Sequence, residues 1–141
     1  MSSFGNELNA KTLTYANTTF RTVIRNGTLI QLTKDDAQNQ IILGAGNTVV
    51  RLPECVPAIK GKMFTIYNGT AATGQGITVQ KFAGDRINGY SDTANGDIVL
   101  ENATNNGDTI TSVTLIASGE REGTTQAGNW YVISTAYRNT A

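Results

Sequence analysis

The chain has 141 residues, which is enough for one domain with a single core. Basic and acidic residues balance at 11 each, and charged residues make up 16% of the chain, well below the roughly 25% of an average soluble domain. The chain has no histidine and one cysteine, Cys55, which excludes a histidine base, an intrachain disulfide and a metal site built from imidazole and thiolate ligands.

Residues 1–19 differ from the rest of the chain and are predicted to form an extended arm outside the main core. They contain few large apolar residues and no turn signal after Gly5. Residues 1–19 contain no apolar run of the kind that forms a signal peptide. No apolar run elsewhere in the sequence approaches the length of a membrane span. Such an arm can order on a partner, and the residues predicted to make this contact are Phe4, Leu8, Leu13 and Tyr15.

Residues 20–135 are predicted to form one all-β domain, followed by a short tail at 136–141. Short runs rich in β-branched and aromatic residues are separated by Gly and Asn, and several runs alternate apolar with polar residues. Strands at this spacing are typical of a compact β-sandwich or β-barrel, here expected to be jelly-roll-like. The runs predict nine strands, at 20–26, 28–33, 40–44, 48–53, 61–68, 76–82, 97–102, 110–118 and 129–135.

Asn-Gly pairs supply the turn signals, and the clearest is Asn26-Gly27. Both residue types tolerate positive φ, which the tight turns of β-hairpins require. Because this pair lies directly between two predicted strands, it predicts a hairpin.

A second turn signal is Gly-Asp followed within two residues by Ile, which occurs at 84–87, 96–98 and 107–110. Gly would make the turn, Asp would accept hydrogen bonds from nearby backbone N–H groups, and Ile would point inward at the start of the next strand. The three copies therefore predict three turns that lead into three strands.

The same segment allows two chemical alternatives, neither of which fits well. A calcium site could use Asp85, Asn88, Asp92, Asn95 and Asp97, but their spacing does not match an EF-hand loop. A glycosidase would need a carboxylate pair, for which the candidates are Asp85, Asp97, Glu101 and Asp108. Such enzymes usually present aromatic platforms, and aromatic residues are only 7% of this chain. We predict no catalytic residue, no metal and no cofactor.

Two residues in strand-like or proline-flanked segments have competing interpretations. Cys55, between two prolines, is predicted to be a partly buried small apolar residue rather than a reactive thiol. Trp130 is predicted to anchor the core from the last strand rather than to form a binding platform with Tyr131. Nucleic-acid binding is not expected, because the net charge is zero and the basic residues are scattered among acidic ones.

The order of these motifs resembles a small β-module found in virion proteins of tailed bacteriophages, including capsid decoration (cement) proteins, head fibres and tail fibres. The motifs are VVRLPECVPAIKGKMFTIYN (49–68), ITVQ (77–80), GDRING (84–89), DIVL (97–100), GDTITSVTLIAS (107–118) and NWYVIS (129–134). The resemblance covers roughly residues 20–135.

The resemblance implies a homotrimer on the outer capsid surface, where it would bridge neighbouring major capsid proteins and stabilise the capsid. The resemblance carries over no catalytic residues, so no enzyme activity is expected, and the charge and apolar runs of the sequence predict neither a nucleic-acid partner nor a membrane. The alternative within the same group is a head-fibre or tail-fibre module that binds a host surface glycan. Its contacts would be Tyr90, Trp130, Tyr131 and Tyr137.

Overall fold

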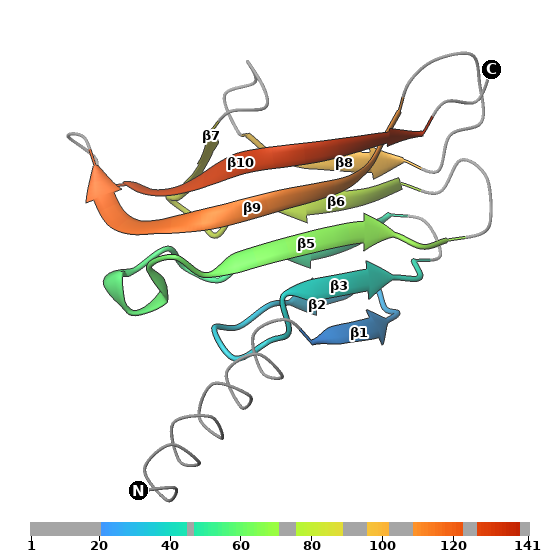
Figure 1. The fold of residues 1–141 in the computed structure, drawn as a ribbon, viewed down its shortest axis with the longest axis horizontal. Helices are drawn as coiled ribbons and strands as arrows, with labels where there is room; N and C mark the ends of the chain where they lie inside the picture. Colours follow the sequence, from blue (N-terminus) through green and yellow to red (C-terminus); the bar gives the residue numbers. More distant parts are fainter. Residues whose placement is uncertain are drawn as a thin grey trace, which may run out of the picture.

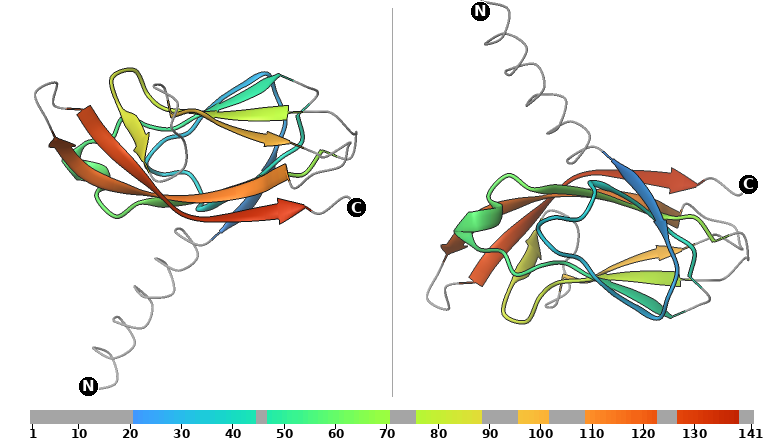
Figure 2. Two further views of the ribbon diagram at one scale, coloured as in Figure 1. Left: turned by 90° about the horizontal axis from the view of Figure 1, so that it is seen from above. Right: turned by 90° about the horizontal axis from the view of Figure 1, so that it is seen from below.

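The computed structural model describes residues 21–44, 47–70, 76–88, 96–101, 109–122 and 127–138. In these ranges ten strands form two sheets that pack against each other, as Figures 1 and 2 show. The prediction of an all-β sandwich is confirmed, while the arm at 1–19 lies outside the described residues. The elements are β1 (Thr22–Arg25), β2 (Leu29–Gln31), β3 (Asn39–Ile42), β4 (Thr48–Arg51), the 3₁₀ helix η1 (Pro57–Ile59), β5 (Met63–Asn68), β6 (Gly76–Gln80), β7 (Arg86–Asn88), β8 (Ile98–Glu101), β9 (Thr109–Glu122) and β10 (Ala127–Arg138).

From β1 to β6 the chain alternates between the two sheets. The six-stranded sheet has the order β1-β3-β5-β9-β10-β7, and the four-stranded sheet has the order β2-β4-β6-β8. Neighbours among β1–β6 are consequently parallel: Thr22 pairs with Asn39, and Asn39 with Thr65. The chain therefore builds three stacked coils, β1–β2, β3–β4 and β5–β6, each of which contributes one strand to each sheet.

The hairpin predicted at Asn26-Gly27 is wrong, because β1 and β2 lie in different sheets. Gly27 does turn the chain, with φ of 147°, and its carbonyl accepts a 2.7 Å hydrogen bond from the Thr48 hydroxyl. The turn carries the chain across the core instead of folding β2 back on β1. A local turn signal specifies a change of direction, whereas the burial of Ile30 in the second sheet decides where the strand goes.

The last strands close the stack in an antiparallel manner. β9 pairs with β5 on one side and with β10 on the other, and β8 pairs with β6. All nine predicted strands are present, and β9 and β10 are longer than expected. β7, which pairs in parallel with β10, is an additional three-residue strand that follows the turn at Gly84 and Asp85.

The core lies between the sheets and is centred on Phe64 and Trp130. Both side chains are fully buried, and their ring centroids are 5.9 Å apart. The prediction that Trp130 is a core anchor is confirmed. Cys55 was predicted to be partly buried and is fully buried, and its thiol donates to the Asn129 carbonyl at 3.2 Å.

The Gly-Asp motifs at 84–87 and 96–98 behave as turns that lead into strands. Gly84 and Gly96 have φ of 87° and 69°, and the motifs lead into β7 and β8. The isoleucines Ile87 and Ile98 point into the core, and the Gly107-Asp108 copy lies outside the described residues.

The aspartates of these two motifs accept hydrogen bonds from backbone groups that are distant in the sequence. Asp85 accepts from the Cys55 N–H at 2.8 Å, and Asp97 accepts from the Lys81 N–H at 3.2 Å. Both partners lie on connections that precede the motif by many residues. Each of these bonds therefore joins two segments of the chain that are distant in the sequence.

Asp85→Ala should lower the free energy of unfolding by about 1–3 kcal/mol, because the buried Cys55 amide would lose its acceptor. Urea unfolding followed by Trp130 fluorescence measures this change. Asp35→Ala, at an exposed position, is the control and should change the stability little. Equal losses in the two variants would contradict the structural role of Asp85.

Candidate functional site

The outer face of the six-stranded sheet carries exposed apolar side chains. Alternation along β5 turns Phe64 and Ile66 into the core and leaves Met63, Thr65 and Tyr67 on the outside. Large apolar residues are exposed on this sheet to fractions of 66% at Ile24, 45% at Tyr67, 38% at Tyr131 and 52% at Ile133. Single exposed apolar residues are common on protein surfaces, so what matters is how these are arranged.

The strand registers place the outward side chains in three cross-strand rows, which we call the outer face. The first row is Met63, Ile116, Tyr131 and Asn88. The second row is Thr22, Asn39, Thr65, Thr114 and Ser134. The third row is Ile24, Ile41, Tyr67, Ser112 and Ala136. Two mainly apolar rows thus flank a polar one.

Some side chains of the polar second row form hydrogen bonds with one another. The hydroxyls of Thr65 and Thr114 are 3.0 Å apart, and the Asn39 amide donates to the Thr22 hydroxyl at 3.3 Å. A polar group that already has a hydrogen-bond partner within the protein costs less free energy to remove from water than a group that would lose its hydrogen bonds to water. None of the three rows contains a charged residue, so a partner could cover them without removing an ion from water.

The outer side of the four-stranded sheet has a different character. Arg51 and Gln80 lie side by side there, with the guanidinium Nε donating to the amide oxygen at 2.8 Å. Glu101 is exposed at the end of β8, and Val99 is 46% exposed next to it. This side therefore mixes charged and apolar groups. The three rows of the outer face contain no charged residue, although Arg86 is exposed on the same side of β7 as Asn88.

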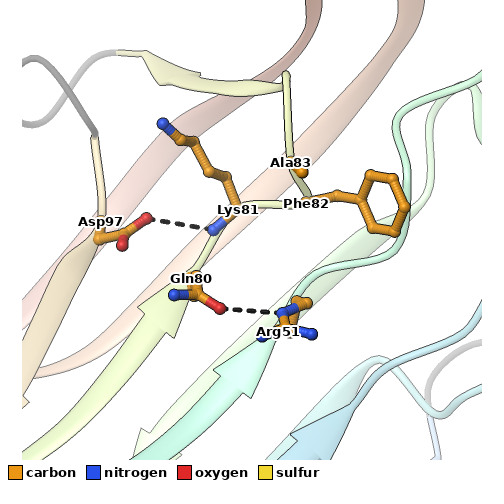
Figure 3. A pocket seen from close by; sticks show the side chains of 6 residues that line it. All are labelled: Arg51, Gln80, Lys81, Phe82, Ala83 and Asp97. Carbon is orange, nitrogen blue, oxygen red and sulfur yellow. Dashed lines mark hydrogen bonds between the residues drawn. The ribbon is translucent and has the colours of Figure 1, made fainter.

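A hollow of about 580 Å³ lies at one end of the four-stranded sheet, and Figure 3 shows its lining residues. The Asp97 carboxylate binds the Lys81 backbone N–H, while the Arg51 guanidinium binds Gln80. In Figure 3 the side chains of Lys81 and Phe82 point to opposite sides, so these two groups do not converge on one point. The hollow offers separate hydrogen-bonding groups. The lining residues are Arg51, Gln80, Lys81, Phe82, Ala83 and Asp97.

The predicted site residues are only partly described. Phe4, Leu8, Leu13, Tyr15 and Tyr90 lie outside the described ranges, as do Asp92, Asn95 and Asp108. Trp130 is buried, so its alternative assignment as a glycan contact is wrong, whereas Tyr131 is exposed on the outer face.

The carboxylates considered for chemistry have different surroundings. Asp85 is buried and holds the Cys55 backbone, Asp97 is half-buried, and Glu101 is exposed. Within the described ranges no group of three or more His, Cys, Asp or Glu side chains is placed to hold a metal ion. No helix in this part of the chain is long and apolar enough to cross a membrane.

Comparison of the chain with protein-family models, with curated proteins and with solved structures gave no significant match in any of the three.

The assignment of inward and outward sides in β5 can be tested at two adjacent positions. Ile66→Lys should abolish folding or cost several kcal/mol, because it places an unpaired charge in the core. Tyr67→Lys should change the free energy of unfolding by about 1 kcal/mol or less, because the new side chain remains in water. Circular dichroism during urea unfolding measures both. Similar costs at the two positions would contradict the assignment.

Proposed function

We propose that this protein is a structural virion component that decorates the outer surface of a tailed-phage capsid and stabilises it, without enzyme activity. The observation that carries the proposal is the outer face, in which two mainly apolar rows flank a polar one and no residue is charged. The order of sequence motifs, which resembles phage decoration and fibre modules, supplies the class of partner. The partner proposed is the major capsid protein.

The outer face has the composition that protein partners favour at the centre of an interface. Tyrosine is enriched at such centres and charged residues are depleted. Tyr67 and Tyr131 would be the main anchors, each combining an apolar ring with a hydroxyl that can reach a partner group. Burial of apolar surface contributes about 25 cal/mol per Å² before the costs of association, so two tyrosines and the neighbouring isoleucines are a substantial source of affinity.

Trimer formation is proposed on the basis of the resemblance and fits the demands of a capsid surface. A capsid repeats the same coat-protein site many times at fixed distances. A trimer that presents three copies of one face binds several of these sites at once, so that contacts of modest strength hold together. Bridging neighbouring coat proteins in this way opposes their separation.

The fibre alternative is supported by one observation, the hollow beside Arg51. Its guanidinium and the nearby Phe82 ring are the kinds of group that bind sugar hydroxyls and ring faces, respectively. Because the side chains of Lys81 and Phe82 point to opposite sides in Figure 3, the lining groups do not all gather at one point, and we place this function second. Glycan-array binding that Arg51→Ala abolishes would favour it over capsid decoration.

The proposed function predicts that Tyr67→Lys impairs binding to capsids that lack the protein. A lysine in the third row would have to lose its hydration when the partner covers the face, so binding should weaken at least roughly tenfold. Val99→Lys is the matched control: Val99 and Tyr67 are exposed to 46% and 45%, on the outer sides of opposite sheets. Co-sedimentation with purified capsids, quantified by mass spectrometry against the major coat protein, measures binding.

The wild-type protein and Val99→Lys should bind in a simple ratio to the coat protein, with hundreds of copies per particle expected of a decoration protein on a capsid-wide lattice. A few copies per particle would instead favour a fibre. Equal loss in the two variants would show that the outer face is not the contact, and no binding by the wild-type protein would refute the decoration role.

A further inference from the structure

Two Asn-Gly-Thr segments of identical sequence lie where strands end in the described part of the chain. Asn26-Gly27-Thr28 follows β1, and Asn68-Gly69-Thr70 begins with the last residue of β5. The chain has three further Asn-Gly pairs, at 88–89, 95–96 and 106–107, and each of these includes a residue outside the described ranges. Because the first two segments consist of the same three residues, a difference in their chemical behaviour in the folded protein must come mainly from the structure around them.

An Asn-Gly pair can react with itself when its groups are free to meet. The backbone nitrogen of the glycine attacks the Cγ atom of the asparagine side chain and ammonia leaves, which is one reason why asparagine is a thermally labile residue. Glycine favours this attack because it has no Cβ atom to obstruct it. A hydrogen bond to the asparagine side chain or to the glycine N–H slows the reaction, because it has to break first.

The structure holds the Asn68-Gly69 pair in an unreactive arrangement. The Asn68 side chain is buried, its amide donates to the Leu100 carbonyl at 3.0 Å, and its oxygen accepts from the Thr70 N–H at 3.1 Å. The Gly69 N–H, whose nitrogen would have to attack, donates to the Ile42 carbonyl at 2.9 Å. Three hydrogen bonds must therefore break before the two reacting atoms can meet.

The Asn26-Gly27 pair has none of these restraints. Both residues are exposed, and among the described residues none forms a hydrogen bond with the Asn26 side chain or the Gly27 N–H. The chain is held on either side of this peptide group: the Arg25 carbonyl accepts from the Leu43 N–H at 2.8 Å, and the Gly27 carbonyl accepts from the Thr48 hydroxyl at 2.7 Å. The reacting groups themselves are thus accessible to each other and to water.

We propose that Asn26 is a site of spontaneous deamidation in the folded protein, whereas Asn68 is protected. The Gly27 nitrogen loses its proton and bonds to Cγ of Asn26, while the Cγ–Nδ2 bond breaks and the amide nitrogen leaves as ammonia. Water then opens the cyclic imide. Opening at the Cγ–N bond gives aspartate, and opening at the bond between the Asn26 backbone carbonyl and the nitrogen gives isoaspartate. One water is consumed and one ammonia is released, and no oxidant is needed.

The modification would change the end of the molecule at which β1 and β2 lie. Both products carry a carboxylate, which takes the formal net charge of the chain from zero to one negative charge. Asn26 lines a hollow of about 520 Å³ together with the exposed Ile24 and Leu29, and Arg25 is already paired with Asp36 there. The new charge would therefore be an additional acidic group beside a balanced ion pair.

The isoaspartate product has a second effect, because it lengthens the main chain by one atom. This atom would lie in the connection that carries the chain from β1 in one sheet to β2 in the other. The proposal goes beyond capsid decoration and does not depend on it, because Asn26 belongs to none of the three rows of the outer face.

Peptide mapping by mass spectrometry, after incubation of the folded full chain in warm, mildly alkaline buffer, tests the proposal. Cleavage after lysine and arginine places Asn26 and Asn68 in separate peptides, in which the mass gain from amide to acid is followed over time. In the folded protein Asn26 should convert at least roughly tenfold faster than Asn68, whose hydrogen bonds must break first. In urea that unfolds the chain, the two residues should convert at similar rates, because both are followed by Gly-Thr.

Asn26→Gln is the control variant, because the longer side chain closes the ring far less readily and the mass gain in this peptide should disappear. A gain that persists at the same rate would come from Gln31 in the same peptide and would overturn the assignment. Equal rates at Asn26 and Asn68 in the folded protein would also overturn the proposal. So would a rate at Asn26 in the folded protein that is roughly tenfold or more below its rate in urea, because the fold would then protect this site as well.

Discussion

The pairing of β5 with β9 is the interaction on which the rest of the architecture depends. It joins the parallel coils to the antiparallel hairpin, with Met63 opposite Ile116 and Thr65 opposite Thr114. Because successive residues face opposite sides, a slip of one position would turn Phe64 out of the core and Tyr67 into it. One register therefore determines both the packing around Trp130 and the rows of the outer face.

The sequence predicted the strands well because their signals are local. Alternation located β5 and β9, and the glycine of the second Gly-Asp motif marked the entry to β8, whereas β7 was not among the predicted strands. The partners of each strand were not predictable in the same way. Asn26-Gly27 has the signal of a hairpin, yet the strands on its two sides lie in different sheets. The sheet that β2 joins depends on the assembled core, in which Ile30 is buried. The bond from Cys55 to Asp85 likewise joins segments that no local pattern connects.

The outer face escaped the sequence analysis for a related reason. Its third row brings together Ile24, Ile41 and Tyr67 from three strands that are separated in the chain. A single strand can show an outward apolar residue in its sequence: Tyr67 stands where the alternation of β5 would place a polar residue. A single such residue is unremarkable, however, and only the strand order shows that several lie side by side.

The alternation of β1–β6 between the sheets has a consequence for how the chain folds. The parallel partners are separated by one whole coil, whereas β9 and β10 are joined by a short connection. Contacts between distant segments form more slowly than local ones, so the hairpin is the natural starting point for folding. During synthesis the coils leave the ribosome first but must wait for β9, because Thr65 meets Thr114 only after 49 further residues have been made. Closure of the core is thus a late event that follows synthesis of the C-terminal third of the chain.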